Sequence, residues 1–240
     1  FRHGDVGHAE DVITAWRRAG NTGAVWIAVE SLYSMDGDRA PLDDLMRLAD
    51  AHGFLLIDEA HATGVFGPRG RGLAHHLEGR DNVVTLHTLG KALGGSGALI
   101  CGARVLIDFL VNRCRPFIFA TAPSPLMAAA GLEALAMLQD EPWRQATLAG
   151  HVVAFHDQMA RRLPQVPLSG SQIVPLIVGP NAETMALAAQ VQARGFDVRG
   201  IRPPTVPEGT SRLRVSLTLN ATRADVLRLA ETLEDLWPDL

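Results

Sequence analysis

Apolar side chains recur along this chain with two different spacings, which distinguish predicted helices from predicted strands. Over 41–52 the apolar positions lie three or four residues apart, the period of one helical face, and Pro41 stands where a helix begins. The short run 54–57 is continuously apolar and follows Gly53, which is typical of a strand buried on both faces. By the same criteria we expect further helices over 6–19, 105–112, 125–140, 144–163, 182–194 and 223–236, and further strands over 24–30, 82–87, 97–101, 173–178, 196–201 and 212–219.

Strands and helices alternate in the first part of the chain, which predicts an α/β fold built on a parallel sheet. After the long helices the pattern changes to a smaller α+β unit, so we place a domain boundary near residue 140, between 1–140 and 141–240. The chain begins with Phe-Arg-His-Gly-Asp instead of Met and carries no signal-peptide pattern. We therefore expect residues 1–140 to be the C-terminal part of a large domain whose N-terminal part is missing.

Composition narrows the functional classes. With 47% hydrophobic and 20% charged residues the chain has the make-up of an ordinary globular protein. The net charge is -4 and there is no basic block, so we expect no nucleic-acid partner. No apolar run is long enough to span a bilayer, so we expect no membrane partner. The two cysteines form neither a disulfide framework nor a metal-ligand spacing, which favours a reduced cytoplasmic location without a metal site.

Lys91 is the only lysine in the sequence, although Lys and Arg together number 22. An amine can lose its proton when it is desolvated and can form a Schiff base with an aldehyde, which a guanidinium cannot do. Lys91 lies in the glycine-rich stretch 85–97, where the backbone can pass close to a ligand. On this stretch alone, a surface lysine in an arginine-rich chain is an equally good interpretation.

Asp58 follows the predicted strand 54–57 and opens the motif Asp-Glu-Ala-His. A carboxylate at the end of a buried strand is costly unless a cation meets it, and a protonated pyridine nitrogen is such a cation. His61 stands three residues later and could reach the phenolic oxygen of the same ring. The alternatives are a solvated acidic turn and a helicase-like box that binds magnesium. That box requires a Gly-x-x-x-x-Gly-Lys-Ser/Thr loop before it, which the sequence lacks.

Lys91 lies one predicted strand beyond Asp58 in the chain. An Asp at one strand end and a Lys after the next strand is the arrangement that pyridoxal 5'-phosphate (PLP) chemistry requires. Thr88 stands three residues before Lys91 and is placed to offer its hydroxyl to a phosphate. The combination therefore predicts a PLP-dependent enzyme more strongly than either motif alone.

Four motifs extend this prediction to a family. They are Ser-Met-Asp-Gly-Asp (34–38), Asp-Glu-Ala-His (58–61), Gly-Pro-Arg-Gly-Arg-Gly (67–72) and Thr-Leu-Gly-Lys-Ala-Leu-Gly (88–94). In this order they resemble the α-oxoamine synthases, PLP enzymes of fold type I that condense an amino acid with an acyl-CoA. The resemblance runs over essentially the whole chain. It implies a PLP-dependent acyltransferase with part of a large, mainly parallel-sheet domain and a smaller C-terminal α+β domain.

The resemblance assigns cofactor roles to the matched residues. Lys91 would hold PLP as a Schiff base and then move the proton at the substrate Cα. Asp58 would partner the pyridinium nitrogen, and His61 would hydrogen-bond the ring oxygen. Ser34 would sit near the phosphate or the ring oxygen, and Thr88 at the phosphate.

Three further residues receive roles on the substrate side or across subunits. Arg214 is the candidate for gripping the amino-acid carboxylate, because a guanidinium binds a carboxylate through two hydrogen bonds. Arg202 is the second candidate, and for both the alternative is a surface or strand-edge arginine. The resemblance also implies a homodimer with its active site at the interface, where Thr121 would reach the cofactor phosphate of the partner subunit.

The substrates follow from two further stretches. Residues 171–179 and 201–214 look most like those of the family members that make 8-amino-7-oxononanoate for biotin biosynthesis. That reaction condenses L-alanine with pimeloyl-CoA, or its carrier-protein equivalent, and releases CO2. One alternative is the condensation of glycine with acetyl-CoA, as in 2-amino-3-ketobutyrate CoA ligase. The other is a non-catalytic fragment that kept the fold.

Two groups of helix residues receive structural predictions. His151 and His156 lie on the predicted helix 144–163 and are expected at the surface. The leucines of the predicted helix 125–140, among them Leu132, are expected to pack in a core.

Overall fold

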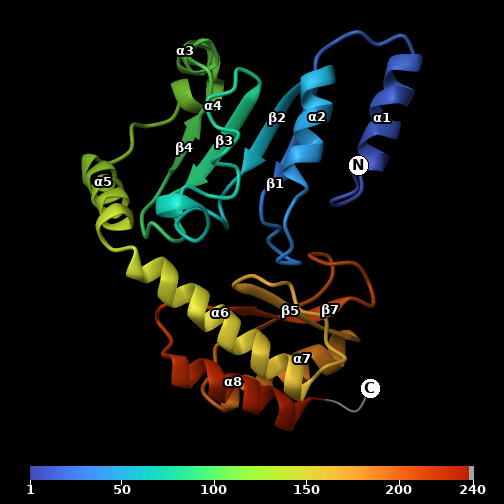
Figure 1. Cartoon of the computed structure of the whole chain (residues 1–240), viewed down its shortest axis with the longest axis vertical. Helices are drawn as coiled ribbons and strands as arrows, with labels where there is room; N and C mark the ends of the chain where they lie inside the picture. The colour runs from blue at the N-terminus through green and yellow to red at the C-terminus, as the bar shows by residue number, and fades with distance from the viewer. Residues whose placement is uncertain (238–240) are drawn as a thin grey trace. The chain divides into compact units, whose positions relative to one another are not determined.

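The computed structural model describes residues 1–237, which form two compact units. The first unit comprises Phe1–Tyr33 and Arg39–Pro142. The second comprises Ser34–Asp38 together with the chain from Trp143 onward. Figure 1 shows the helices and strands of both units, which are described separately below.

A four-stranded sheet forms the centre of the first unit. Three parallel strands, β1 (Val25–Glu30), β2 (Gly53–Asp58) and β3 (Val83–Thr88), lie side by side in that order. The fourth strand, β4 (Ala98–Cys101), pairs with β3 in the antiparallel direction. The mainly parallel α/β sheet that the sequence predicts is thus confirmed, and its strand bounds differ from the predicted ones by one residue or so.

Helices connect these strands and follow them. Between the strands lie α2 (Leu42–His52) and the short 3-10 helix η1 (Pro68–Gly70), while α1 (Val6–Arg18) precedes the sheet. After β4 come α3 (Arg104–Arg113), α4 (Arg115–Ile118) and α5 (Pro125–Asp140). The apolar face of α2 packs against the sheet, in a core shared by helix and strand residues. Among the fully buried side chains of that core are Leu45, Leu55 and Ile57.

Gly53 makes the passage from α2 to β2 possible. It caps the C-terminus of α2 with a positive φ of 158°, and it is also the first residue of β2. A Cβ at this position would overlap the backbone of Val25, the residue that pairs with it on β1. Glycine therefore ends the helix and lets two parallel strands pair at their first residues.

Large apolar side chains remain exposed on β4, α3, α4 and α5. The prediction that Leu132 packs in a core is wrong, because its side chain is 71% exposed and Gly131 is the one buried residue that the structure describes on α5. The pattern of 125–140 identifies a helix correctly, but it does not reveal what covers that helix. The other large apolar side chains exposed in this region are Leu99, Ile100, Val105, Phe109, Val111, Phe117, Ile118, Phe119, Leu126 and Met127.

The second unit packs helices against a three-stranded antiparallel sheet. Its strands are β5 (Ile173–Gly179), β6 (Arg199–Ile201) and β7 (Ser211–Ser216), with β7 in the centre. Its helices are α6 (Trp143–Arg162), α7 (Asn181–Ala193) and α8 (Arg223–Leu236). Phe155, Met159 and Leu213 are among the fully buried side chains of its core.

The surface position expected for His151 is also wrong. His151 is 7% exposed and lies on the buried side of α6, where its Nδ1 has no hydrogen-bond partner in residues 1–237. His156 is half-buried on the same helix, and its Nε2 lies 3.1 Å from the carbonyl oxygen of Ser171. Burial lowers the pKa of His156, while the hydrogen bond to Ser171 opposes that shift.

Among the helices of residues 1–237, none is both long and apolar enough to span a bilayer.

Thr222 begins α8 with a reciprocal capping box, and its replacement should have a measurable cost. The Thr222 hydroxyl accepts from the Asp225 backbone N–H, and the Asp225 carboxylate accepts from the Thr222 backbone N–H at 2.9 Å. The Thr222 hydroxyl also donates to the Asp225 carboxylate at 2.6 Å, and this hydrogen bond, with the one from the Thr222 backbone N–H, lowers the pKa of Asp225 to about 2, with help from Arg228. Thr222→Ala should lower the free energy of unfolding by about 1 kcal/mol in urea denaturation. Thr222→Ser is the control and should retain most of the stability; equal losses in both variants would contradict the capping role.

Candidate active site

The carboxyl ends of the parallel strands bring Asp58 to one edge of the sheet. Asp58 is the last residue of β2, and its neighbours in register are Glu30 on β1 and Leu86 on β3. These three residues line one cavity of about 440 Å³ at that edge, together with Ala28, Val29, Tyr33 and Leu56. One Asp58 carboxylate oxygen accepts from the backbone N–H of Ala60 at 2.8 Å. The carboxylate therefore faces a space where a ligand could lie, in the usual position for ligands of α/β sheets.

His61 lies in the turn that follows β2. The turn is closed by backbone hydrogen bonds from Ala62 and Thr63 to the carbonyl oxygen of Glu59, at 3.0 and 2.8 Å. His61 is half-buried there, three residues after Asp58. The tight turn thus places both side chains near the same end of β2.

Thr88 ends β3, and its hydroxyl is a buried polar atom without a partner. Its Oγ1 has no hydrogen bond to any residue of 1–237. Because Thr88 follows Leu86 by two residues on the same strand, it lies on the face that carries Leu86 and the cavity. A buried hydroxyl is usually hydrogen-bonded, so an orphaned one here indicates a missing acceptor or donor.

Lys91 lies in the loop between β3 and β4. Backbone hydrogen bonds from Leu89 to Gly97 at 2.9 Å, and from Gly95 to Leu89 at 2.7 Å, close this loop. The Lys91 side chain is exposed, and its amine forms no hydrogen bond or ion pair with the part of the chain that the structure describes. Since the loop leaves β3 at the same edge where Asp58 ends β2, the free amine and the carboxylate share one end of the sheet.

Thr121 stands apart from these residues in the chain. It lies in the exposed segment between α4 and α5, next to the exposed apolar residues Ile118 and Phe119. Within residues 1–237 its side chain forms no hydrogen bond to Asp58 or Lys91. Its predicted role at the phosphate of a partner subunit therefore remains a prediction.

In the second unit the structure brings Ser34 and Arg214 together. Arg214 lies on the central strand β7 and is half-buried. Its Nε donates to the carbonyl oxygen of Ser34 at 2.7 Å, and one terminal nitrogen donates to the Ser216 hydroxyl at 2.8 Å. Arg214 also lines a cavity of about 620 Å³ with Met35 and residues of β6 and α8. The sequence predicted a role for each residue but not this contact.

Arg202 occupies a different environment. It is exposed at the start of the loop after β6, just before the two prolines. Arg214, by contrast, is half-buried on β7, and two hydrogen bonds orient its guanidinium. Of the two arginines we therefore favour Arg214 as the candidate for binding a carboxylate.

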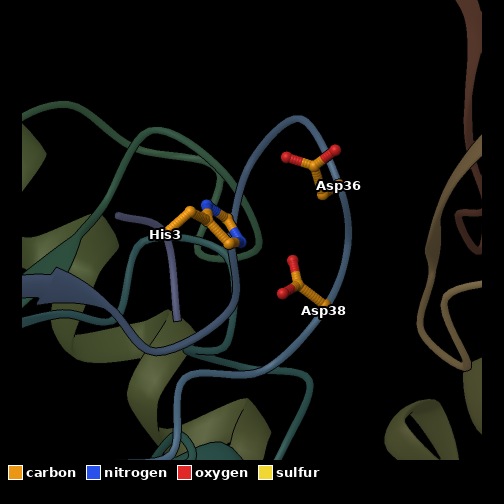
Figure 2. Close-up of side chains that lie close together, drawn as sticks. All are labelled: His3, Asp36 and Asp38. Carbon is orange, nitrogen blue, oxygen red and sulfur yellow. The ribbon is translucent and has the colours of Figure 1, made fainter. Parts of the chain in front are cut away.

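Arg212 is a residue that the sequence-based prediction missed. Its guanidinium is almost fully buried, donates to the Asp36 carboxylate at 2.6 Å and donates to the Met35 carbonyl oxygen at 3.2 Å. Figure 2 shows Asp36 and Asp38 on the single loop that runs through the Ser34–Asp38 segment. Arg212 and Arg214 thus fasten this segment to β7, a long-range contact for which the local sequence has no signal.

The sequence of this chain is similar to those of known proteins. Residues 2–233 match the family model for aminotransferase class I and II. A relative from Anaeromyxobacter dehalogenans, 8-amino-7-oxononanoate synthase, is 43% identical over 242 residues, which cover all of this chain and 60% of that protein. This chain therefore spans about 60% of the length of the relative.

Two solved structures show the same fold. Serine palmitoyltransferase from Sphingomonas wittichii is 27% identical with a TM-score of 0.86, over 98% of this chain and 59% of that one. A structure of SPT with a PLP internal aldimine is 26% identical with a TM-score of 0.88, over 98% and 60%. The fold-type I architecture expected from the sequence is thus confirmed.

Proposed function

Because this chain belongs to the aminotransferase class I and II family, and within it to the α-oxoamine synthases, we propose that it carries the PLP site of an acyltransferase. The observation that carries the proposal is the pair at the sheet edge. Lys91 offers a free amine on the loop after β3, and Asp58 offers a carboxylate facing a cavity at the end of β2. SPT, a structural neighbour, is known with PLP bound.

The residues present fit this cofactor. Thr88 supports the fit because its buried hydroxyl lacks a partner and could donate to a phosphate oxygen. Asp58 fits a protonated pyridine nitrogen because it is a carboxylate held at a strand end that faces open space. His61, half-buried in the next turn, would hydrogen-bond the ring oxygen. Ser34 in the second unit and Thr121 are the further proposed contacts.

When bound, PLP supplies an aldehyde for covalent attachment and a ring that withdraws electrons from the substrate Cα. Lys91 Nζ would form that attachment and would then carry the proton between Nζ and the substrate Cα. The Asp58 carboxylate would hold the proton on the ring nitrogen, so that the ring keeps its electron demand. Arg214, oriented by its bond to Ser34, would bind the amino-acid carboxylate, and Arg202 is the second candidate.

We further propose L-alanine and pimeloyl-CoA, or a pimeloyl carrier protein, as substrates and 8-amino-7-oxononanoate as the product. The 43% identity to 8-amino-7-oxononanoate synthase supports this choice. The structural likeness to serine palmitoyltransferase, at 27% identity, supports the shared condensation but not a particular acyl chain. The competing candidates are glycine with acetyl-CoA and a fold that has lost its chemistry.

A substrate matrix separates these candidates. Purified protein with PLP is incubated with L-alanine, glycine or L-serine, each combined with pimeloyl-, acetyl- or palmitoyl-CoA, and free CoA, CO2 and the amino-ketone are measured. We expect the largest kcat/KM for L-alanine with pimeloyl-CoA. Preference for glycine with acetyl-CoA would overturn the substrate assignment but not the PLP site. No turnover with any pair, in protein that binds PLP, would support the non-catalytic candidate.

We propose that the enzyme acts as a homodimer in the cytoplasm. The exposed apolar side chains of α3 to α5, such as Phe109, Phe117 and Phe119, form a surface of the kind that subunits cover. Both cysteines, Cys101 and Cys114, are free thiols, which fits a reducing compartment.

A further inference from the structure

Glu59, the residue after Asp58, is a fully buried carboxylate to which the proposed chemistry gives no task. Its exposed fraction is 0%. It forms no ion pair with any cationic side chain in residues 1–237. Burying a carboxylate is costly unless hydrogen bonds satisfy it. The burial of this carboxylate beside Asp58 therefore needs a structural or functional explanation.

Three donors surround the Glu59 carboxylate. One oxygen accepts from the Ser31 hydroxyl at 2.7 Å and from the Leu73 backbone N–H at 3.1 Å. The other oxygen accepts from the Ala74 backbone N–H. Ser31 follows β1, while Leu73 and Ala74 end the glycine-rich loop after η1. The side chain thus links the end of one strand to a loop that is 14 residues away in the chain.

Gly72 shows how closely the loop fits this carboxylate. A Cβ at Gly72 would lie 2.5 Å from the Glu59 carboxyl carbon, and within 2.8 Å of both oxygens. Gly72 also has a φ of +96°, a conformation that other residues rarely adopt. The glycine is therefore required both by the turn and by the approach of the Glu59 carboxylate.

The Glu59 backbone extends the same junction. Its N–H donates to the Leu86 carbonyl oxygen on β3 at 2.8 Å. Its carbonyl oxygen accepts from the Thr63 hydroxyl and from the Thr63 N–H, both at 2.8 Å, which closes the turn that carries His61. The Glu59 backbone therefore fixes β3 and the turn of His61, which both carry a proposed cofactor contact.

We propose that Glu59 is a positioning residue, which holds Asp58 and His61 in place by anchoring the loop of Gly72–Ala74 and the end of β1. Glu59 acts through its neighbours, because its side chain is buried against the loop while Asp58 faces the cavity. The positioning role rests on the proposed function of Asp58 and His61. The anchoring contacts with Ser31, Leu73 and Ala74 do not depend on it.

Glu59→Gln tests the anchor with little change of shape. An amide has one acceptor oxygen and one NH2 donor, so at least one N–H of Leu73 or Ala74, or the Ser31 hydroxyl, loses its acceptor. In cofactor-free protein, hydrogen exchange at residues 72–74 should become faster relative to the sheet strands. The Kd for PLP should rise by about tenfold or more, and kcat should fall by about tenfold or more. This is the size typical for removing the partner that orients a ligating side chain.

Two control variants make the result decisive. Leu45→Ala removes a fully buried core side chain of the same unit that takes no part in the hydrogen bonds of Glu59, so it reports the effect of lost core packing with those hydrogen bonds in place. Ser31→Ala removes one donor of three and should shift exchange and PLP affinity in the same direction as Glu59→Gln, but less. It also serves as the test variant if Glu59→Gln does not fold.

The possible outcomes separate the claims. Unchanged exchange at residues 72–74 in Glu59→Gln would overturn the anchor. If exchange becomes faster in Glu59→Gln, but its PLP affinity and kcat fall no further than in Leu45→Ala, the positioning role is overturned. Glu59 would then have a structural role alone. If the unaltered protein binds no PLP, the proposed function fails while the exchange result still decides the anchor.

Discussion

Lys91→Ala is expected to lower kcat on the order of 10⁴-fold and to leave the fold intact. The loss should be this large because the lysine both attaches the cofactor and transfers the proton at the substrate Cα, and proton transfer alone contributes up to about 10⁴-fold. The fold should survive because the side chain is exposed and makes no hydrogen bond within residues 1–237. Steady-state kinetics and circular dichroism on the same preparation measure both effects.

Lys91→Arg is the matched control for this result. Arginine keeps the positive charge and much of the reach of lysine, but its guanidinium does not lose its proton. If Lys91 acts as an amine, the Arg variant should be as inactive as the Ala variant, and added methylamine should restore part of the activity of the Ala variant. Substantial activity in the Arg variant would instead favour the interpretation that Lys91 is an ordinary surface charge.

Asp58→Asn is expected to lower kcat on the order of 10²-fold. An amide of the same shape cannot stabilise a proton on the ring nitrogen as a carboxylate does, so the ring loses part of its electron demand. The hydrogen bond from the Ala60 N–H can still be accepted by the amide oxygen, so the turn after β2 should hold. Kinetics with saturating PLP separate this loss from weaker cofactor binding.

Glu30→Gln is the control for Asp58→Asn. Glu30 stands opposite Asp58 in register and lines the same cavity, so it carries the same charge into the same space. Since no cofactor contact is proposed for Glu30, its replacement should change kcat only a few-fold, the size expected from the electrostatic effect of one charge at the edge of the site. Equal losses in the two variants would show that the site needs negative charge in general and not the Asp58 carboxylate.

Local sequence patterns predicted most of the elements of this fold. The bounds of α5 and α8 agree with the predicted ranges, because Ser124 with Pro125 and the Thr222 capping box mark where each helix begins. The strand 196–201 was predicted too long: only Arg199–Ile201 pairs with β7. The helix Arg115–Ile118 was missed, since four residues are too few to show a helical period.

Features that depend on distant partners could not be predicted. The burial of Glu59 follows from a loop 14 residues later, and the place of Ser34–Asp38 in the second unit follows from arginines of β7. The exposure of Leu132 likewise depends on what covers α5, which a helical period does not report. For the site, the spacing of Asp58 and Lys91 indicated the chemistry because parallel strands end at one edge of a sheet.

The central claim is that Lys91 is the amine to which PLP is attached. The test gives an unambiguous peptide, because Lys91 is the only lysine among these 240 residues. The protein is incubated with PLP, reduced with borohydride, digested and examined by peptide mass spectrometry. The account predicts that the peptide with Lys91 gains the mass of the reduced cofactor. PLP that is bound at full occupancy while this peptide stays unmodified would contradict it.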